Sequence, residues 1–234
     1  MNLRNKARAV AHRWRRPLFE LIGSDRYSHL ALNELDRKLK KYIDFRDGYF
    51  IEAGANDGLT QSNTYWFEQF RGWRGLLIEA VPEKAQACRR NRPRATIVQS
   101  ALVALDTIRS VQINTADLMA FVAVGSDEDA VERARLARAM AVQNLTQVVK
   151  IEVPAKTLSS ILDDLESPMV DLFSLDVEGF ELEVLKGLDL RRHRPTYILL
   201  ETDKIDAALE VLGGNYRVLE CLSHHDYLLQ AICP

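Results

Sequence analysis

The sequence predicts an α/β fold in which a mostly parallel sheet carries helices on both faces. Short apolar runs alternate with segments of helical length, which is the pattern of consecutive βα units. A loop containing two glycines follows the first of these runs, where open α/β sheets bind ligands. Near the C-terminus, two apolar runs are separated by a short polar stretch, which indicates an antiparallel hairpin that closes the sheet.

The first half of the chain contains a leading helix and then two βα units. Residues 30–43 repeat apolar side chains at spacings of three and four, which predicts a helix covering one face of the sheet. Pro82 suits the first turn of a helix. The predicted strands are residues 49–52, 76–78 and 96–98, and the helices between them are residues 60–70 and 82–91.

Residues 102–153 interrupt this rhythm and form a predicted insertion. We expect strands at 111–113 and 148–153 and a helix with arginines at 127–140, within a lid-like segment at about 115–146. If the chain is an enzyme, this helix is our first candidate for the segment that selects its substrate, although a charged outer face is the simpler interpretation. The rhythm then resumes with strands at 169–175 and 196–200, helices at 179–186 and 204–212, and hairpin strands at 216–221 and 227–232.

Bulk properties favour one globular domain in a reducing compartment. The chain has 234 residues, 47% of them hydrophobic, and a net charge of −2 gives no global attraction to nucleic acid. Cys88, Cys221 and Cys233 are too widely spaced for a metal motif or a disulfide scaffold. No apolar run approaches the roughly 18 residues of a membrane span. We therefore expect a soluble cytoplasmic protein, divided into an N-terminal helical extension at 1–45 and a main domain at 46–234.

The N-terminal segment concentrates positive charge. Residues 1–22 carry six arginines and lysines and no acid before Glu20, interleaved with apolar side chains. One interpretation is weak peripheral attachment to the inner face of an anionic membrane. The simpler one is a leader helix that packs Trp14 and Phe19 on the body of the protein.

The loop after the first strand, Gly54-Ala55-Asn56-Asp57-Gly58, is the first candidate for ligand binding. Glycine permits positive φ and removes a side chain from the path of a ligand, and a following helix N-terminus attracts an anionic group. Glu79 ends the second strand, near the offset at which an acid meets ribose hydroxyls. The loop lacks the third glycine of a pyrophosphate fingerprint, which argues against a nicotinamide dehydrogenase.

Four segments of the chain together resemble the FkbM-type methyltransferase family, over about residues 48–202. They are Phe50-Ile-Glu-Ala-Gly-Ala-Asn-Asp-Gly58, Leu76-Leu-Ile-Glu-Ala-Val-Pro82, Val153-Pro-Ala-Lys-Thr-Leu158 and Val170-Asp-Leu-Phe-Ser-Leu-Asp-Val-Glu-Gly-Phe-Glu181. The resemblance implies a seven-stranded class I methyltransferase fold that binds S-adenosylmethionine. Glu52-Ala53 and Phe180 depart from the residues common in the family, without removing a functional group.

The resemblance also implies positions for the parts of the cofactor. Gly54 to Gly58 would lie near the methionine part, with Glu52 and Ser62 beside them in the site. Glu79 would bind the ribose, and Ser100 and Ala101 would lie near the adenine.

Asp176 and Glu178 follow a buried strand and are the candidate catalytic acids. Asp176 is expected to contact the cofactor ammonium or an acceptor hydroxyl, and Glu178 to act as general base. Alternatively, both acids cap the helix that follows. Asp176, Glu178 and Glu201 offer the oxygen ligands that Mg²⁺ prefers, but there is no dense acidic cluster, so we assign no metal-binding residues and leave the metal requirement open. Further candidate bases are His193, His224 and His225.

The resemblance to the FkbM family implies an O-methyltransferase acting on a hydroxyl of a small molecule or a glycan. Methyl transfer from a sulfonium depends chiefly on in-line positioning, so a catalytic triad is not required. The alternative is a noncatalytic module that keeps the fold and docks through its basic N-terminus. A nucleic-acid methyltransferase is disfavoured by the net charge, and we expect no nucleic acid partner.

Overall fold

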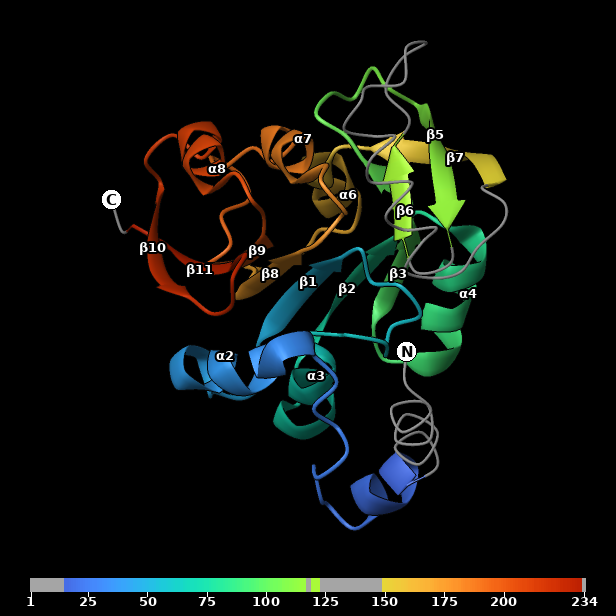
Figure 1. The fold of residues 1–234 in the computed structure, drawn as a ribbon, viewed down its shortest axis with the longest axis vertical. Coiled ribbons are helices and arrows are strands. Elements are labelled where there is room, and N and C mark those ends of the chain that lie inside the picture. Colours follow the sequence, from blue (N-terminus) through green and yellow to red (C-terminus); the bar gives the residue numbers. More distant parts are fainter. Residues whose placement is uncertain (1–14, 117–118, 123–148, 233–234) are drawn as a thin grey trace.

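The computed structural model of the chain describes residues 15–116, 119–122 and 149–232, and a seven-stranded sheet forms its centre (Figure 1). The strands are β1 Tyr49–Ala53, β2 Arg74–Glu79, β3 Thr96–Gln99, β8 Leu172–Leu175, β9 Tyr197–Glu201, β10 Tyr216–Cys221 and β11 Asp226–Ala231. Their order is β10-β11-β9-β8-β1-β2-β3, with the five strands from β9 to β3 parallel and β11 antiparallel to both of its neighbours, β9 and β10. The predicted mostly parallel sheet with a closing hairpin is confirmed.

The central strands are buried on both faces, which explains their nearly continuous apolar sequences. In β2, Leu76 and Ile78 belong to one core cluster, whereas Leu77 between them belongs to the cluster on the opposite face. Because parallel strands share their direction, the loops that follow β1, β2, β8 and β9 meet at one edge of the sheet. This edge positions the candidate site.

Helices cover both faces of the sheet (Figure 1). The cluster around Leu77 includes residues of α2 (Leu35–Ile43), α3 (Tyr65–Arg71) and α4 (Pro82–Asn91). The cluster around Ile78 includes residues of α6 (Leu158–Asp164), α7 (Glu181–Lys186) and α8 (Ile205–Val211). A short 3-10 turn, η1 (Leu32–Glu34), precedes α2, so the predicted helix at 30–43 is present in its second part. The bounds of α4 coincide with the prediction.

A second, four-stranded sheet stands beside the first and contains the strands predicted within the insertion. Its members are β4 (Ala101–Leu102), β5 (Ser110–Ala116), β6 (Met119–Val122) and β7 (Val149–Lys156), in the order β4-β7-β5-β6. Val111 and Ile151 pack at the edge of its small core, around Val153 and Ala155. The predicted helix at 127–140 and most of the lid-like segment at 115–146 lie outside the described residues.

Three helices differ from the expectation. Helix α3 begins at Tyr65 and not at residue 60, because the preceding residues bind a buried carboxylate described below. Helix α7 begins at Glu181, since Glu178 and Gly179 have positive φ values of 56° and 96°. Helix α6 was not predicted, although Thr157 supplies a capping hydroxyl that accepts from Ser160 N at 3.1 Å.

The N-terminal segment packs on α3. Residues 15–21 are helical, and Phe19 contacts Tyr27 edge-on at 4.7 Å between ring centroids, while Trp14 lies outside the described residues. The apolar side chains of α2 belong to the same core cluster as Phe50 of β1, so residues 35–43 share the core of the main sheet. Within the described residues, no helix has the length and apolar character to cross a bilayer. Membrane attachment of residues 1–22 stays a prediction.

Candidate functional site

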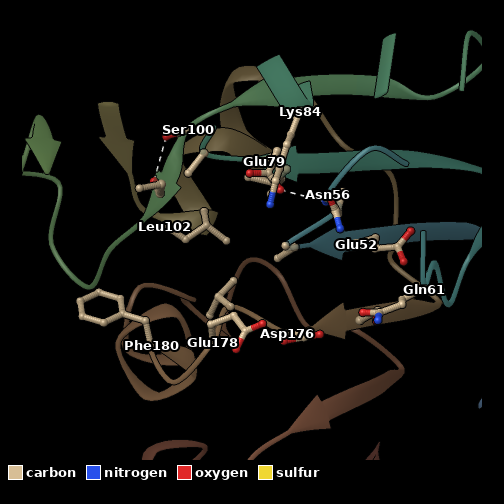
Figure 2. A pocket seen from close by; sticks show the side chains of 18 of the residues that line it. Glu52, Asn56, Gln61, Glu79, Lys84, Ser100, Leu102, Asp176, Glu178 and Phe180 are labelled. Atoms are coloured by element: carbon tan, nitrogen blue, oxygen red, sulfur yellow. Dashed lines mark hydrogen bonds between the residues drawn. The ribbon is translucent and has the colours of Figure 1, made fainter. Parts of the chain in front are cut away.

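A cavity opens at the carboxyl edge of the main sheet, beyond the ends of β1, β2 and β8 (Figure 2). The space inside it, with the open mouth included, is about 970 Å³. Its polar lining residues are Glu52, Asn56, Thr60, Gln61, Asn63, Glu79, Lys84, Ser100, Ser174, Asp176 and Glu178. The structure therefore brings most of the predicted site residues into one cavity.

The loop after β1 is held by close backbone contacts. The N–H groups of Gly54 and Ala55 both donate to the carbonyl of Ile78, at 3.0 and 3.2 Å. Gly54 has φ of +80°, and a Cβ there would lie 1.7 Å from the carbonyl oxygen of Asp176. The absent side chain of Gly54 thus makes room for the neighbouring loop after β8, while the residue itself lines the cavity.

Glu79 lies at the end of β2 with its carboxylate held toward the cavity (Figure 2). Its two oxygens accept from Asn56 N and Val81 N, each at 2.9 Å, and the side chain is 6% exposed. Burial raises the pKa of Glu79, while these N–H groups and the nearby Lys84 oppose the rise. Each carboxylate oxygen keeps acceptor capacity for a further donor, such as a ribose hydroxyl.

Glu52 lines the cavity, but its carboxylate is occupied by the chain that follows the loop. It accepts from Ser62 Oγ at 2.9 Å, Asn63 N at 2.8 Å and Thr64 Oγ1 at 2.5 Å. The hydroxyl of Ser62 in turn accepts from Tyr65 N at 3.1 Å. The residues leading into α3 are therefore held by an acid of the chain itself, and the binding of an anionic part of a ligand at this helix end stays a prediction.

Arg92 supports this loop from behind and was not singled out from the sequence. Its guanidinium is fully buried, pairs with the Glu68 carboxylate at 2.7 Å, and donates to the Gly58 carbonyl at 3.0 Å and to Ser62 Oγ at 3.1 Å. The Glu52 carboxylate lies 3.7 Å away. A buried cation thus joins two buried acids and the end of the glycine loop.

Three predicted cofactor-binding residues do not line the cavity. Asp57 turns back on its own loop, where its Oδ1 accepts from Leu59 N at 2.9 Å and Thr60 N at 2.6 Å. Gly58, at φ +80°, packs so closely that a Cβ would lie 2.9 Å from Arg92 Cγ. Ser62 belongs to the buried network just described. All three shape the loop without facing the space beside it.

Asp176 and Glu178 line the opposite wall of the cavity, in the loop after β8 (Figure 2). Burial, together with the adjacent Glu201 carboxylate, raises the pKa of Asp176 well above its ordinary value. Burial and neighbouring carboxylates raise the pKa of Glu201 to about 7. The start of α7, at Phe180, has no side-chain cap. Glu181 Oε1 instead accepts from Val177 N at 3.2 Å and Gly179 N at 2.7 Å, and so holds the loop that carries Asp176 and Glu178.

The third wall of the cavity is mostly apolar. Ala101, Leu102, Ile113 and Phe180 line it beside Ser100, whose hydroxyl donates to the Ala101 carbonyl at 2.8 Å. Sequence reasoning found Ser100 and Ala101 and missed the others, because Ile113 and Phe180 reach this wall from distant segments. An apolar wall of this kind suits an aromatic ring.

The candidate histidine bases lie outside the cavity lining. His193 Nε2 is bonded to Asp163 at 2.7 Å in an exposed position. His225 Nε2 lies 3.2 Å from Glu201 Oε1, and its ring contacts that of His224. Lining residues that the sequence analysis missed include Gln61, Asn63 and Lys84, which lie in segments with no distinctive motif.

Comparison with known proteins gives one family match. The model of the methyltransferase FkbM domain matches residues 52–229. No curated protein matches the chain.

Three solved structures are similar at low sequence identity. A methyltransferase FkbM from Methylobacillus flagellatus KT is 14% identical with a TM-score of 0.47, covering 92% of this chain and 52% of its own. A precorrin-6y C5,15-methyltransferase from Geobacter metallireducens GS-15 is 15% identical with a TM-score of 0.45, covering 85% and 87%. A TehB-like SAM-dependent methyltransferase from Corynebacterium glutamicum ATCC 13032 Kitasato is 11% identical with a TM-score of 0.43, covering 97% and 96%. The chain spans about half the length of the first of these.

Proposed function

Because the chain belongs to the FkbM methyltransferase family, we propose that it transfers a methyl group from S-adenosylmethionine to a hydroxyl of a small molecule or a glycan. Its fold is the α/β class I methyltransferase fold, with the seven-stranded mixed sheet and C-terminal hairpin predicted from the sequence. The observation that carries the proposal is the position of the Glu79 carboxylate, buried at a strand end in the cavity that also contains the Gly54 loop and Asp176.

The residues present fit the three parts of the cofactor. Glu79 offers its remaining acceptor capacity to the ribose diol, and the apolar wall at Leu102 and Phe180 offers a surface for adenine. Asn63 donates Nδ2 to Ser174 Oγ at 3.0 Å, while its buried Oδ1 has no partner among the described residues. An acceptor without a donor suits the ammonium of the methionine part.

The cofactor supplies an electrophilic methyl group on a sulfonium, and the protein supplies position and proton removal. An acceptor hydroxyl must lie in line with the methyl group, next to a group that takes its proton as the new bond forms. Asp176 and Glu178 are the acids on the cavity wall opposite Glu79. We assign Asp176 to contact with the acceptor hydroxyl or the ammonium, and Glu178 to the general base.

Calorimetric titration with S-adenosylhomocysteine tests the assignment of the cofactor site. Wild type is expected to bind, and Glu79→Ala to bind at least about tenfold more weakly, because charge-assisted hydrogen bonds to the ribose are lost. Glu83→Ala is the matched control, since this acid is exposed in the first turn of α4 and should leave binding unchanged. No binding by wild type, or equal binding by the Glu79 variant, contradicts the assignment.

Turnover with labelled S-adenosylmethionine and a panel of sugars, phenols and lipids tests the acceptor class. Methylation of a hydroxyl compound, lost in Glu178→Gln, is the expected result. Cofactor binding without turnover of any compound would favour the noncatalytic module instead.

A further inference from the structure

Three side chains that can ligate a metal converge next to the cavity. Glu201 ends β9, Asp226 begins β11, and His225 lies in the turn before it. One ligand atom from each of the three lies within 4.8 Å of the others. His225 Nε2 and Glu201 Oε1 are 3.2 Å apart. The cluster combines two carboxylates and an imidazole. It shares only Glu201 with the three acids considered from the sequence as metal ligands.

The sheet register fixes this convergence. Glu201 and Asp226 are directly paired residues of neighbouring antiparallel strands, so their side chains leave the same face of the sheet next to each other. Leu175 of β8 pairs with Leu200 of β9, which places Asp176 beside Glu201 in the same row. The hairpin turn then brings His225 to the end of the row. Backbone pairing, and not chance side-chain rotation, holds the donors together.

The carboxylates of the cluster have few partners in the described residues: Glu201 shares a hydrogen bond with Asp176 and lies against His225. Like charges directly opposite in a sheet repel, and a buried carboxylate is costly without a cation or several donors. Asp226 is 4% exposed, and its side-chain partner in the described part of the chain is the Ser223 hydroxyl. Within that part, no Lys or Arg nitrogen lies within 4.0 Å of the Glu201 or Asp226 carboxylates, and the ion pair present is the one with His225.

We propose that Glu201, His225 and Asp226 bind one divalent cation. Two carboxylate oxygens and one imidazole nitrogen suit Mn²⁺ or Mg²⁺ more than a thiolate-seeking metal, and Mn²⁺ tolerates the nitrogen ligand well. Asp176 stands between this cluster and the cavity that it lines. Resting on the proposed function, a cation there would lie behind Asp176 and offset the negative charge of the acids next to this cavity wall.

Titration of the full-length protein with Mn²⁺ tests the site, after treatment with a chelator and its removal. Free Mn²⁺ is measured by its electron paramagnetic resonance signal, which is lost on binding. Wild type is expected to bind one ion per chain, and Glu201→Gln and Asp226→Asn each to bind at least about tenfold more weakly. Asp203→Asn is the matched control, because this exposed acid lies two residues from Glu201 and should leave binding unchanged.

Absence of Mn²⁺ binding by wild type, or unchanged binding by both ligand variants, overturns the proposal. Thermal melting of each variant shows whether it is folded, and His225→Gln gives a third test through a different ligand. S-adenosylhomocysteine binding in the presence of a chelator separates this inference from the proposed function. Cofactor binding without Mn²⁺ binding contradicts the metal site alone. Mn²⁺ binding without cofactor binding contradicts the proposed function alone.

Discussion

The two sides of the cavity satisfy their charges in different ways. On the glycine-loop side, Glu79 receives two backbone N–H groups and Arg92 lies between buried carboxylates, so each charge has partners within the chain. On the other side, Asp176, Glu201 and Asp226 stand at the ends of successive strands as a row of acids. Within the described residues, the nitrogen-bearing side chain next to these acids is the imidazole of His225, and no Lys or Arg forms an ion pair with them.

On the glycine-loop side, the charged groups have their partners before any ligand binds. On the acid side, they do not. Satisfied networks make a binding surface rigid, and a preorganised surface loses less entropy when it binds. Uncompensated acids remain costly until a proton, a cation or a donor on a substrate meets them. We therefore expect substitutions to have opposite effects on the two sides.

The largest effect should come from breaking the buried ion pairs behind the glycine loop. Arg92→Met removes the guanidinium and leaves Glu68 and Glu52 buried without a cation, so the free energy of unfolding should fall by about 3–5 kcal/mol. Urea unfolding measures this change. Arg94→Ala is the control, because Arg94 also approaches Glu68 but is half exposed and should cost about 0–1 kcal/mol. Equal losses in the two variants would refute the buried network.

The next largest effect should come from the close approach between the two loops. Gly54→Ala forces a Cβ against the Asp176 carbonyl at a φ of +80°, and should lower the free energy of unfolding by roughly 2–4 kcal/mol. Gly214→Ala has nearly the same φ with nothing within 4 Å, so it should lose only about 1 kcal/mol. Similar losses at both positions would mean that φ alone matters and that the loops have room to separate.

On the acid side, removing a charge should stabilise the protein. Glu201→Gln removes repulsion between directly paired acids, so with a chelator present at pH 8 the free energy of unfolding should rise by about 0.5–1 kcal/mol. Excess Mn²⁺ should then stabilise wild type more than the variant, because only the intact cluster gains from the ion. Destabilisation by Glu201→Gln in chelator would show that the row is already satisfied.

The smallest expected signal is the labelling of Cys88 in the native protein. Burial, and the charges of Glu79, Glu52 and Asp57, raise the pKa of this thiol to about 12, so at pH 8 it is neutral as well as inaccessible. A thiol reagent should modify the exposed Cys221 and leave Cys88 intact until the chain unfolds, as mass spectrometry can show. Fast labelling of Cys88 would mean that the glycine-loop side opens.

The same shift has a consequence for stability in alkali. The unfolded thiol of Cys88 ionises near its ordinary pKa of 9.0 while the native thiol stays protonated. Because only the unfolded chain loses this proton, ionisation of the Cys88 thiol lowers the free energy of unfolding as pH rises above about 9. Cys88→Ser should weaken this part of the alkaline decline.

The sequence predicted the strands and the loops after them because their signals are local. An apolar run such as 76–78, followed by an acid at Glu79, reveals a strand and the ligand-facing position after it. Glu181 and Arg92 illustrate what local signals miss. Arg92 lies in the basic stretch 89–94, where an arginine resembles a solvated one, and only the tertiary packing of α4 against the loop buries it.

Long-range pairing explains the remaining differences. Ile113 joins the cavity wall because β5 pairs with β7, some forty residues away in the chain. His225 and Asp226 join Glu201 only through the register between β9 and β11. These pairings depend on how the whole sheet is assembled, and no motif within a short window encodes them.

The packing of residues 25–29 against Trp66 gives the protein its own fluorescent reporter. The Trp66 indole donates to Asp25 at 3.0 Å and is stacked on His29, with 5.5 Å between ring centroids, at the start of the helix that follows the glycine loop. Indole emission is sensitive to water and to a neighbouring imidazole. In a variant with Trp14 and Trp73 changed to phenylalanine, the fluorescence of Trp66 would therefore follow, in real time, whether this segment stays in place while ligands enter and leave.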